Sequence, residues 1–176
     1  MRKRLSVILV VAAAALSLAF QSPSGWTRLD SAEGGFTVLM PGPVAPKDKV
    51  FTKSDPRVGT YTAHTFSKTT DKGIFIVGWL DYAPGVNVDA RGELTSSRDT
   101  FVKLLKGRLL SERPLTLEGH PGLEYTAEND QAVVKVHTYV VGRRPYAVVA
   151  VTYKGFDDSQ NVNAFLSSFR LKPADR

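Results

Sequence analysis

Residues 133–151, VVKVHTYVVGRRPYAVVAV, decide the fold of this chain. Two runs rich in valine and aromatic residues, which favour strands, flank the turn signal GRRP at 142–145. The second run, 146–151, is almost wholly apolar, and a strand with two apolar faces needs cover on both sides. The stretch therefore predicts a hairpin within a sheet that other layers cover on both faces.

Strand patterns continue toward the N-terminus of this hairpin. Residues 74–80, IFIVGWL, are apolar at odd and even positions alike. Such a strand should lie centrally in the sheet, with a helix or a second layer over each face. Glycine and proline separate the other segments, as is typical of a β-rich domain. The other segments expected to be extended are 26–29, 36–40, 49–52, 57–67, 111–117 and 122–128.

Two segments carry the spacing of an amphipathic helix. In 89–106 apolar residues recur three and four positions apart, and Asp89 is placed to accept hydrogen bonds from the amides of the first turn. The second helix follows the capping residues 157–159 and runs to about residue 168. Its apolar face consists of Val162, Phe165, Leu166 and Phe169. Strands and helices together predict an α+β domain.

The N-terminus has the pattern of a secretory signal peptide. Residues 1–4, MRKR, are basic, residues 5–18 form an apolar run, and small side chains stand at Ser17 and Ala19. We expect residues 1–19 to be a signal peptide that is cleaved after Ala19. The apolar run is shorter than the roughly 18 residues or more of a membrane-spanning helix. Retention of this segment as an N-terminal anchor is the alternative.

The mature part, residues 20–176, is expected to form a single domain, because it shows no composition break, long linker or repeat. The chain contains no cysteine, so it forms no disulfide bond. The bacterial lipoprotein anchor needs a cysteine at the cleavage point and is therefore excluded. We expect a periplasmic or extracellular protein with no integral membrane segment after cleavage.

The charge of the chain argues against a nucleic-acid partner. Lys and Arg number 23, Asp and Glu number 17, and three of the basic residues lie in the predicted leader. The remaining domain is only mildly basic, whereas nucleic-acid-binding domains carry a basic stripe or patch. We therefore expect no nucleic-acid partner.

Several stretches together resemble a known family: Trp26, EGGFTVLMPG at 33–42, GHPGLE at 119–124, the hairpin at 139–151 and FLSSF at 165–169. In these turn-and-strand signatures the mature chain is similar to the PsbP/DcrB/LpqN superfamily of exported domains. The resemblance implies an antiparallel β-sheet flanked by helices on both faces, an α/β/α sandwich. It also implies accessory or binding roles, as in lumenal photosystem assembly factors and cell-envelope lipoproteins, rather than catalysis. No ligand residue of the family is matched.

Candidate catalytic and metal-binding residues are sparse. His64, His120 and His137 show none of the short spacings that metal sites use, and each lies in a different predicted element. The chain has no Gly-x-Ser-x-Gly elbow, no Ser-x-x-Lys pair and no thiol, which are common bearers of nucleophilic catalysis. We expect no catalytic residue, metal or cofactor. A periplasmic hydrolase or a metal-binding enzyme is the alternative.

One surface motif is a candidate binding site. Arg143 and Arg144 lie at the predicted hairpin tip and Tyr146 follows them. Guanidinium groups bind carboxylate and phosphate at two points, so this tip could contact an anion or an acidic partner. A solvated tip without a binding role is the alternative. The loop at 83–87, which leaves the predicted central strand, is the other place where a partner could be held.

These observations give one expected function and two alternatives. We expect an exported, non-catalytic accessory or binding domain of the cell envelope, whose partner is an envelope protein or a small apolar ligand. The alternatives are the periplasmic enzyme and an envelope stress or structural protein.

Overall fold

The computed structural model describes residues 23–42, 47–55 and 59–173, so the predicted signal peptide and its cleavage point lie outside the described residues. In chain order the elements are β1 (Trp26–Ser31), β2 (Phe36–Pro41), β3 (Lys47–Asp55), β4 (Gly59–Thr69), β5 (Gly73–Tyr82), α1 (Ala90–Leu104), β6 (Arg108–Leu117), β7 (His120–Glu128), β8 (Ala132–Val141), β9 (Arg144–Tyr153), α2 (Ser159–Ser168) and β10 (Arg170–Leu171).

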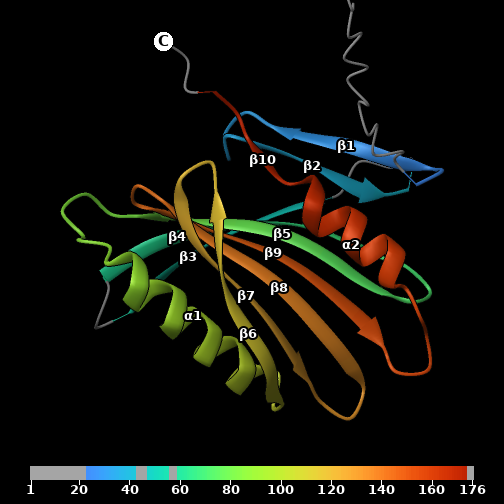
Figure 1. Cartoon of the computed structure of the whole chain (residues 1–176). Helices are drawn as coiled ribbons and strands as arrows, with labels where there is room; N and C mark the ends of the chain where they lie inside the picture. Colours follow the sequence, from blue (N-terminus) through green and yellow to red (C-terminus); the bar gives the residue numbers. More distant parts are fainter. Residues whose placement is uncertain (1–22, 43–46, 56–58, 174–176) are drawn as a thin grey trace, which may run out of the picture.

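Two antiparallel sheets form the β structure (Figure 1). The larger has seven strands in the order β3-β4-β5-β9-β8-β7-β6, and the smaller has three in the order β1-β2-β10. The hairpin expected from 133–151 is confirmed as β8 and β9, which pair antiparallel from Ala132 opposite Tyr153 to Val141 opposite Arg144. The segment 74–80 lies in β5, between β4 and β9, and so occupies the central place that its two apolar faces predicted.

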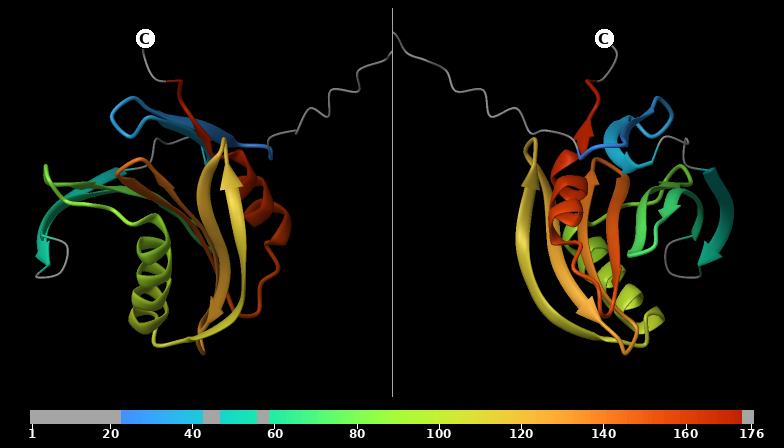
Figure 2. Two further views of the ribbon diagram at one scale, coloured as in Figure 1. Left: turned by 60° about the vertical axis from the view of Figure 1, so that its left-hand side comes forward. Right: turned by 90° about the vertical axis from the view of Figure 1, so that its right-hand side faces the viewer.

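The expectation of an α/β/α sandwich, with helices covering both faces of the sheet, is wrong. The fold is β-rich, and the described part of the chain has two helices. α1 covers one face of the large sheet, whereas the small sheet lies over the other face together with α2 (Figure 2). Alternate side chains of one amphipathic strand bury an apolar face as a helix does, so β2 takes the place of a helix in this layer.

The main core fills the space between the two sheets and α2. β2 supplies Phe36, Val38 and Met40, each at most 1% exposed, to this core. Phe36 lies among aromatic rings of the large sheet and of the end of α2, with ring centroids 5.7 Å from Trp79 and 5.3 Å from Phe169. Aromatic side chains in such edge-on and tilted arrangements bury large areas of apolar surface. This layer fixes one face of the large sheet rigidly.

A smaller core lies between the large sheet and α1. Its buried residues come from β7, β8 and β9, and Phe101 and Leu105 from the helical segment pack against it. Their spacing is the helical periodicity predicted for 89–106, and Asp89 caps the helix as expected. α1 therefore packs on β6, β7 and β8, which form one half of this face of the sheet.

Candidate functional site

A groove lies between α1 and the half of the large sheet formed by β3, β4 and β5. It arises because α1 packs on the other half of the same face. Two adjoining hollows, with volumes of about 410 Å³ and about 610 Å³, make up this space, which we call the α1 groove. The two hollows share the lining residues Phe51, Leu80, Glu93, Ser97 and Phe101.

The floor of the α1 groove is low because small side chains meet there across neighbouring strands. The register places Gly78 of β5 between Thr65 of β4 and Ala147 of β9, and Thr138 of β8 lies beyond Ala147. Paired residues of adjacent strands project to the same face of a sheet, so these positions form one row. A side chain at Gly78 is not tolerated, since a Cβ there would lie 2.6 Å from the carbonyl oxygen of His64.

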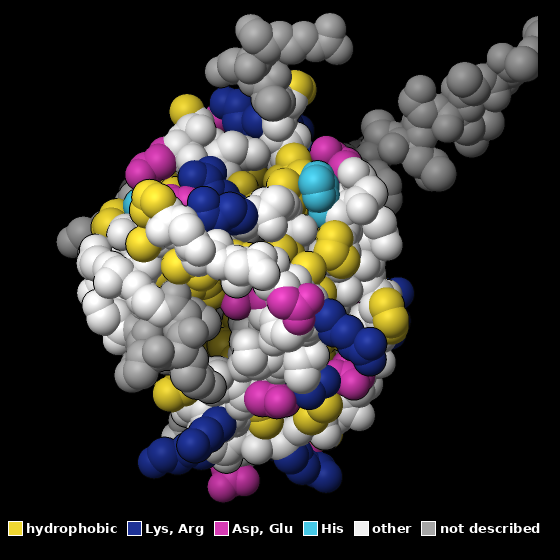
Figure 3. All heavy atoms as spheres, turned by 90° about the vertical axis from the view of Figure 1, so that its left-hand side faces the viewer, with side chains coloured by type: hydrophobic (Ala, Val, Ile, Leu, Met, Phe, Trp, Pro, Cys, Tyr) yellow, Lys and Arg dark blue, Asp and Glu magenta, His cyan; other side chains and the backbone are white. Residues whose placement is uncertain are grey.

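The walls and rim of the groove are apolar and aromatic. Phe51 of β3 is 44% exposed, and Leu104 at the end of α1 is 77% exposed. Tyr61 and Tyr82 are paired across β4 and β5, with ring centroids 6.0 Å apart. Figure 3 shows apolar side chains recessed among polar ones on this side of the molecule. Contiguous exposed apolar surface with a polar rim is typical of binding sites.

Among the side chains that the structure describes, one carboxyl group lines the groove. Glu93, in the first turn of α1, accepts a hydrogen bond of 2.9 Å from the hydroxyl of Tyr82. Burial raises the pKa of the Glu93 carboxyl above its usual 4.5, and the hydrogen bond from Tyr82 acts in the opposite direction. The turn is held by Asp89, whose Oδ2 accepts from the backbone N–H of Gly92 at 2.8 Å. The helix cap therefore places a carboxylate beside apolar walls.

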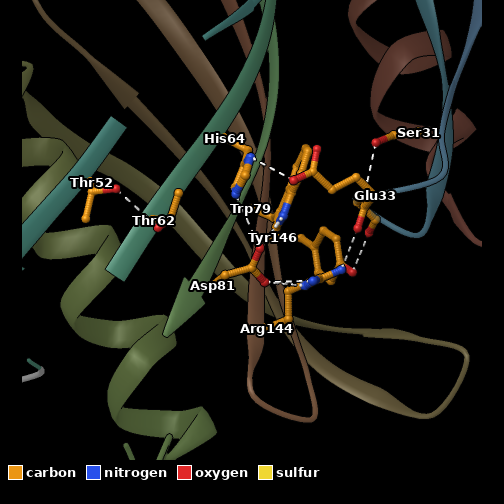
Figure 4. A network of polar contacts seen from close by, with 10 residues as sticks. Ser31, Glu33, Thr52, Thr62, His64, Trp79, Asp81, Arg144 and Tyr146 are labelled. Atoms are coloured by element: carbon orange, nitrogen blue, oxygen red, sulfur yellow. Dashed lines mark hydrogen bonds and ion pairs between the residues drawn. The ribbon is translucent and has the colours of Figure 1, made fainter. Parts of the chain in front are cut away.

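A second polar arrangement lies on the opposite face of the same strands (Figure 4). The imidazole of His64 stacks on Trp79, with centroids 4.3 Å apart and planes 2° from parallel. Asp81 accepts hydrogen bonds from Nε1 of Trp79 at 3.0 Å and from Nε of Arg144 at 2.8 Å. Its Oδ2 lies 3.3 Å from Nε2 of His64. We call these four residues the Asp81 network.

The Asp81 network holds the turn between β1 and β2 against β9. Nη1 of Arg144 donates to the carbonyl oxygen of Glu33 at 2.9 Å. The hydroxyl of Tyr146, a buried neighbour of the network, donates to the carbonyl oxygen of Gly34 at 2.7 Å. The bond from Arg144 to Asp81 is partly buried, and hydrogen bonds to charged groups contribute roughly 1.5–3 kcal/mol each. The arrangement therefore joins the small sheet to the large one.

The structure separates the three residues that were predicted to contact an anion. Arg144 and Tyr146 lie together at the turn between β1 and β2, where each bonds a backbone carbonyl. Arg143 is exposed, and its Nη2 donates to the carbonyl oxygen of Ala83 at 2.6 Å, in the loop that was the other candidate. An anion contact at this tip stays a prediction, and Arg143 is the residue through which it would act.

The three histidines lie in different surroundings. His64 is 6% exposed, and its Nδ1 has no hydrogen-bond partner among the described residues. His120 begins β7, and His137 of β8 bonds Glu124 through Nε2 at 2.7 Å. Within residues 23–42, 47–55 and 59–173, His, Asp and Glu side chains form no group of three or more that is arranged to hold a metal ion.

The pair formed by His137 and Glu124 lies in a partly buried cluster on the strands β6, β7 and β8. Burial lowers the pKa of His137, although the hydrogen bond to Glu124 opposes this effect. The pKa of Glu124 is lowered, chiefly because Arg113 donates two hydrogen bonds to its carboxylate, at 2.7 and 2.8 Å. These contacts describe a neutral histidine beside an ion pair, which stabilises adjacent strands.

Sequence reasoning missed the α1 groove. A signal was present in Gly78, which interrupts the apolar run of β5, because glycine inside a strand often marks a close backbone approach. Ala147 in the apolar strand β9 was a second small residue. Their significance depends on the register that places them side by side, which the sequence alone does not give.

The fold of this chain is similar to that of a solved structure. Neither a family model nor a curated protein sequence matches the chain. Among solved structures, the chain is similar to the solution structure of cyanobacterial PsbP (CyanoP) from Synechocystis sp. PCC 6803, with a TM-score of 0.50 and 10% sequence identity. The match covers 92% of this chain and 98% of that one. In the part of the chain that the structure describes, neither helix has the length and apolar character needed to cross a membrane. The chain has a PsbP-like fold.

Proposed function

We propose that this chain is an exported, non-catalytic binding domain that takes a small, largely apolar molecule into the α1 groove. The observation that carries the proposal is the groove itself, with its hollow of about 410 Å³ beneath the first turns of α1. Small-molecule sites in proteins are typically clefts of roughly 300–1,000 Å³, lined by apolar and aromatic side chains with a few polar groups. The groove matches this description in both size and lining.

The supporting scaffold suits a binding site that is formed before the ligand arrives. The floor strands β5 and β9 lie at the centre of the large sheet, and their other face is fixed by the main core. A ligand that enters a preformed site loses less free energy to ordering of the protein. We therefore expect binding to leave the backbone of the floor in place.

Export and an accessory role in the cell envelope belong to the same proposal. The signal-peptide pattern of residues 1–19 supports export, and the PsbP-like fold supports an accessory domain rather than an enzyme. Mass spectrometry of the protein isolated from its native cells tests export, because cleavage after Ala19 gives a mature chain that begins at Phe20. An intact chain recovered from the cytosolic fraction contradicts it.

A dye-binding experiment tests the groove. N-phenyl-naphthylamine is uncharged and apolar, and its fluorescence rises when it leaves water. Ser97 lines both hollows, whereas Thr95 lies on the exposed surface of α1 and lines neither. We expect the unaltered protein and the matched control Thr95→Phe to bind the dye, and Ser97→Phe to bind it at least about tenfold more weakly, because the ring fills the space. Equal binding by both variants would contradict the proposal.

A further inference from the structure

We infer that the ligand of the α1 groove carries an ammonium group, and that this group binds between Glu93 and the rings of Tyr61 and Tyr82. This inference rests on the proposed function and specifies the chemistry of its ligand. The apolar part of the molecule then lies over the floor row that contains Gly78 and Ala147.

The Glu93 carboxylate is the first group in the groove that favours a cation. An ionised carboxylate has about four acceptor sites, and among the described residues Tyr82 donates one hydrogen bond to Glu93. Glu93 is half-buried in an apolar groove, where a charge is poorly solvated, and burial disfavours its ionised form. A ligand cation removes this disadvantage, since an opposite charge within a few ångströms favours the ionised carboxylate.

Aromatic rings near that carboxylate favour a cation independently. The hollow of about 610 Å³ is lined by four aromatic side chains, Phe51, Tyr61, Tyr82 and Phe101. Aromatic faces attract cations, and clusters of such rings are the known means by which proteins bind quaternary ammonium groups. One ring already shows this behaviour within the protein, because Nζ of Lys53 lies 5.1 Å from the centroid of Phe51. Rings and carboxylate thus favour the same kind of head group.

One cation, Lys53, lies near the rim of the groove. Lys53 is exposed, so water and salt screen its charge, whereas Glu93 lies inside the groove. An anionic head group would approach the Glu93 carboxylate as it entered, at a cost in free energy. Among the described side chains at the groove, Lys53 is the cation that a cationic head group would meet, and it is exposed. The charges facing the groove therefore favour a cation, and Lys53→Met should strengthen its binding about twofold to threefold.

Three amphiphiles with the same ten-carbon chain test the inference by calorimetric titration below their micelle concentrations: decyltrimethylammonium, decanol and decanoate. We expect the ammonium compound to bind about tenfold more tightly than decanol, and decanoate to bind most weakly. Glu93→Gln should reduce the preference for ammonium, because the rings remain, and leave the affinity for decanol unchanged. Tyr61→Leu should weaken the ammonium compound more than decanol, because leucine keeps the apolar wall but removes the ring.

The outcomes separate this inference from the proposed function. Equal binding of all three compounds, sensitive to Ser97→Phe, overturns the inference and leaves the groove as an apolar site. Tightest binding of decanoate overturns the inference in favour of Lys53 as the head-group contact. No binding of any compound overturns both proposals. A preference for ammonium that is undiminished in both Glu93→Gln and Tyr61→Leu overturns the placement of the head group.

Discussion

Substitution of Ala147 by leucine tests whether the α1 groove is real space. Ala147 lies in the floor row between Gly78 and Thr138, beneath a hollow of about 410 Å³. Leucine adds three carbons, which at about 0.8 kcal/mol per buried methylene favour folding by at most about 2.4 kcal/mol. Ordering a leucine side chain costs about 0.5–1 kcal/mol, and the hollow is partly open to water. We therefore expect Ala147→Leu to raise the free energy of unfolding by about 1 kcal/mol.

The same substitution should weaken ligand binding, because the added carbons occupy the floor. Stability and binding thus change in opposite directions, which a simple loss of structure does not produce. Urea denaturation followed by tryptophan fluorescence measures the stability. An unchanged dependence of the free energy of unfolding on urea concentration indicates that the unfolded state is the same in both proteins. Titration with N-phenyl-naphthylamine measures the binding, with an expected loss of about tenfold or more.

Ala127 provides the matched control for Ala147. It lies on β7, is 0% exposed, and lines neither hollow of the groove. Ala127→Leu should lower the free energy of unfolding by about 1–3 kcal/mol, as expected for overpacking of a filled core. If Ala147→Leu destabilises the protein as much as Ala127→Leu does, the space above Ala147 is closed and the argument for a binding groove fails.

Three further predictions concern charged groups. Glu93→Gln should raise the free energy of unfolding near pH 7 by about 0.5 kcal/mol, allowing for solvent screening. This gain should vanish below pH 4.5, where the native carboxyl is protonated. Denaturation across this pH range measures the gain, and a pH-independent effect contradicts burial as its cause. Arg144→Met should destabilise the protein by about 1–3 kcal/mol and speed amide exchange in the turn between β1 and β2. The control Arg143→Met should change the stability by less than about 0.5 kcal/mol. Equal effects of the two substitutions would refute the role of the Asp81 network in joining the two sheets. The native pKa of His137 lies below 6.5 and that of Glu124 below 4.5, so the stability that these residues contribute should be present above those values and be lost as the pH falls through the native pKa of each. His137→Gln should remove the decline in the free energy of unfolding that begins near pH 6.5. An unchanged pH profile of stability in this variant contradicts the prediction.

Local patterns were sufficient to predict the strands of the large sheet. The valine-rich runs of β8 and β9 and the two-faced run in β5 gave both the hairpin and the central position. The error lay in the layer that covers the main core. Phe36, Val38 and Met40 alternate as in any strand with one buried face, and this pattern does not say whether the strand joins the main sheet or lies across it. The resemblance therefore assigned this layer to helices alone, whereas the small sheet lies there beside α2.

The contacts of the hairpin tip depend on segments that are distant in the sequence. Arg144 follows a turn and precedes a proline, which locally indicates an exposed side chain. Its partners are the carboxylate of Asp81, 63 residues away, and the carbonyl of Glu33, 111 residues away. No local pattern contains such contacts, so the sequence predicted a solvated tip or an anion site for Arg143 and Arg144 alike.

The two faces of β5 explain why the groove persists as a cavity. On one face Phe75, Val77 and Trp79 are buried beneath the small sheet, which fixes the strand in place. On the other face Gly78 supplies no side chain to fill the space, and its lack of a Cβ is required by the close approach of β4. The floor therefore cannot rise to meet α1, and α1 cannot move toward it without leaving its own core on β7 and β8. A hollow held open from both sides costs stability, because apolar walls remain in contact with water, and a ligand that covers those walls recovers that free energy.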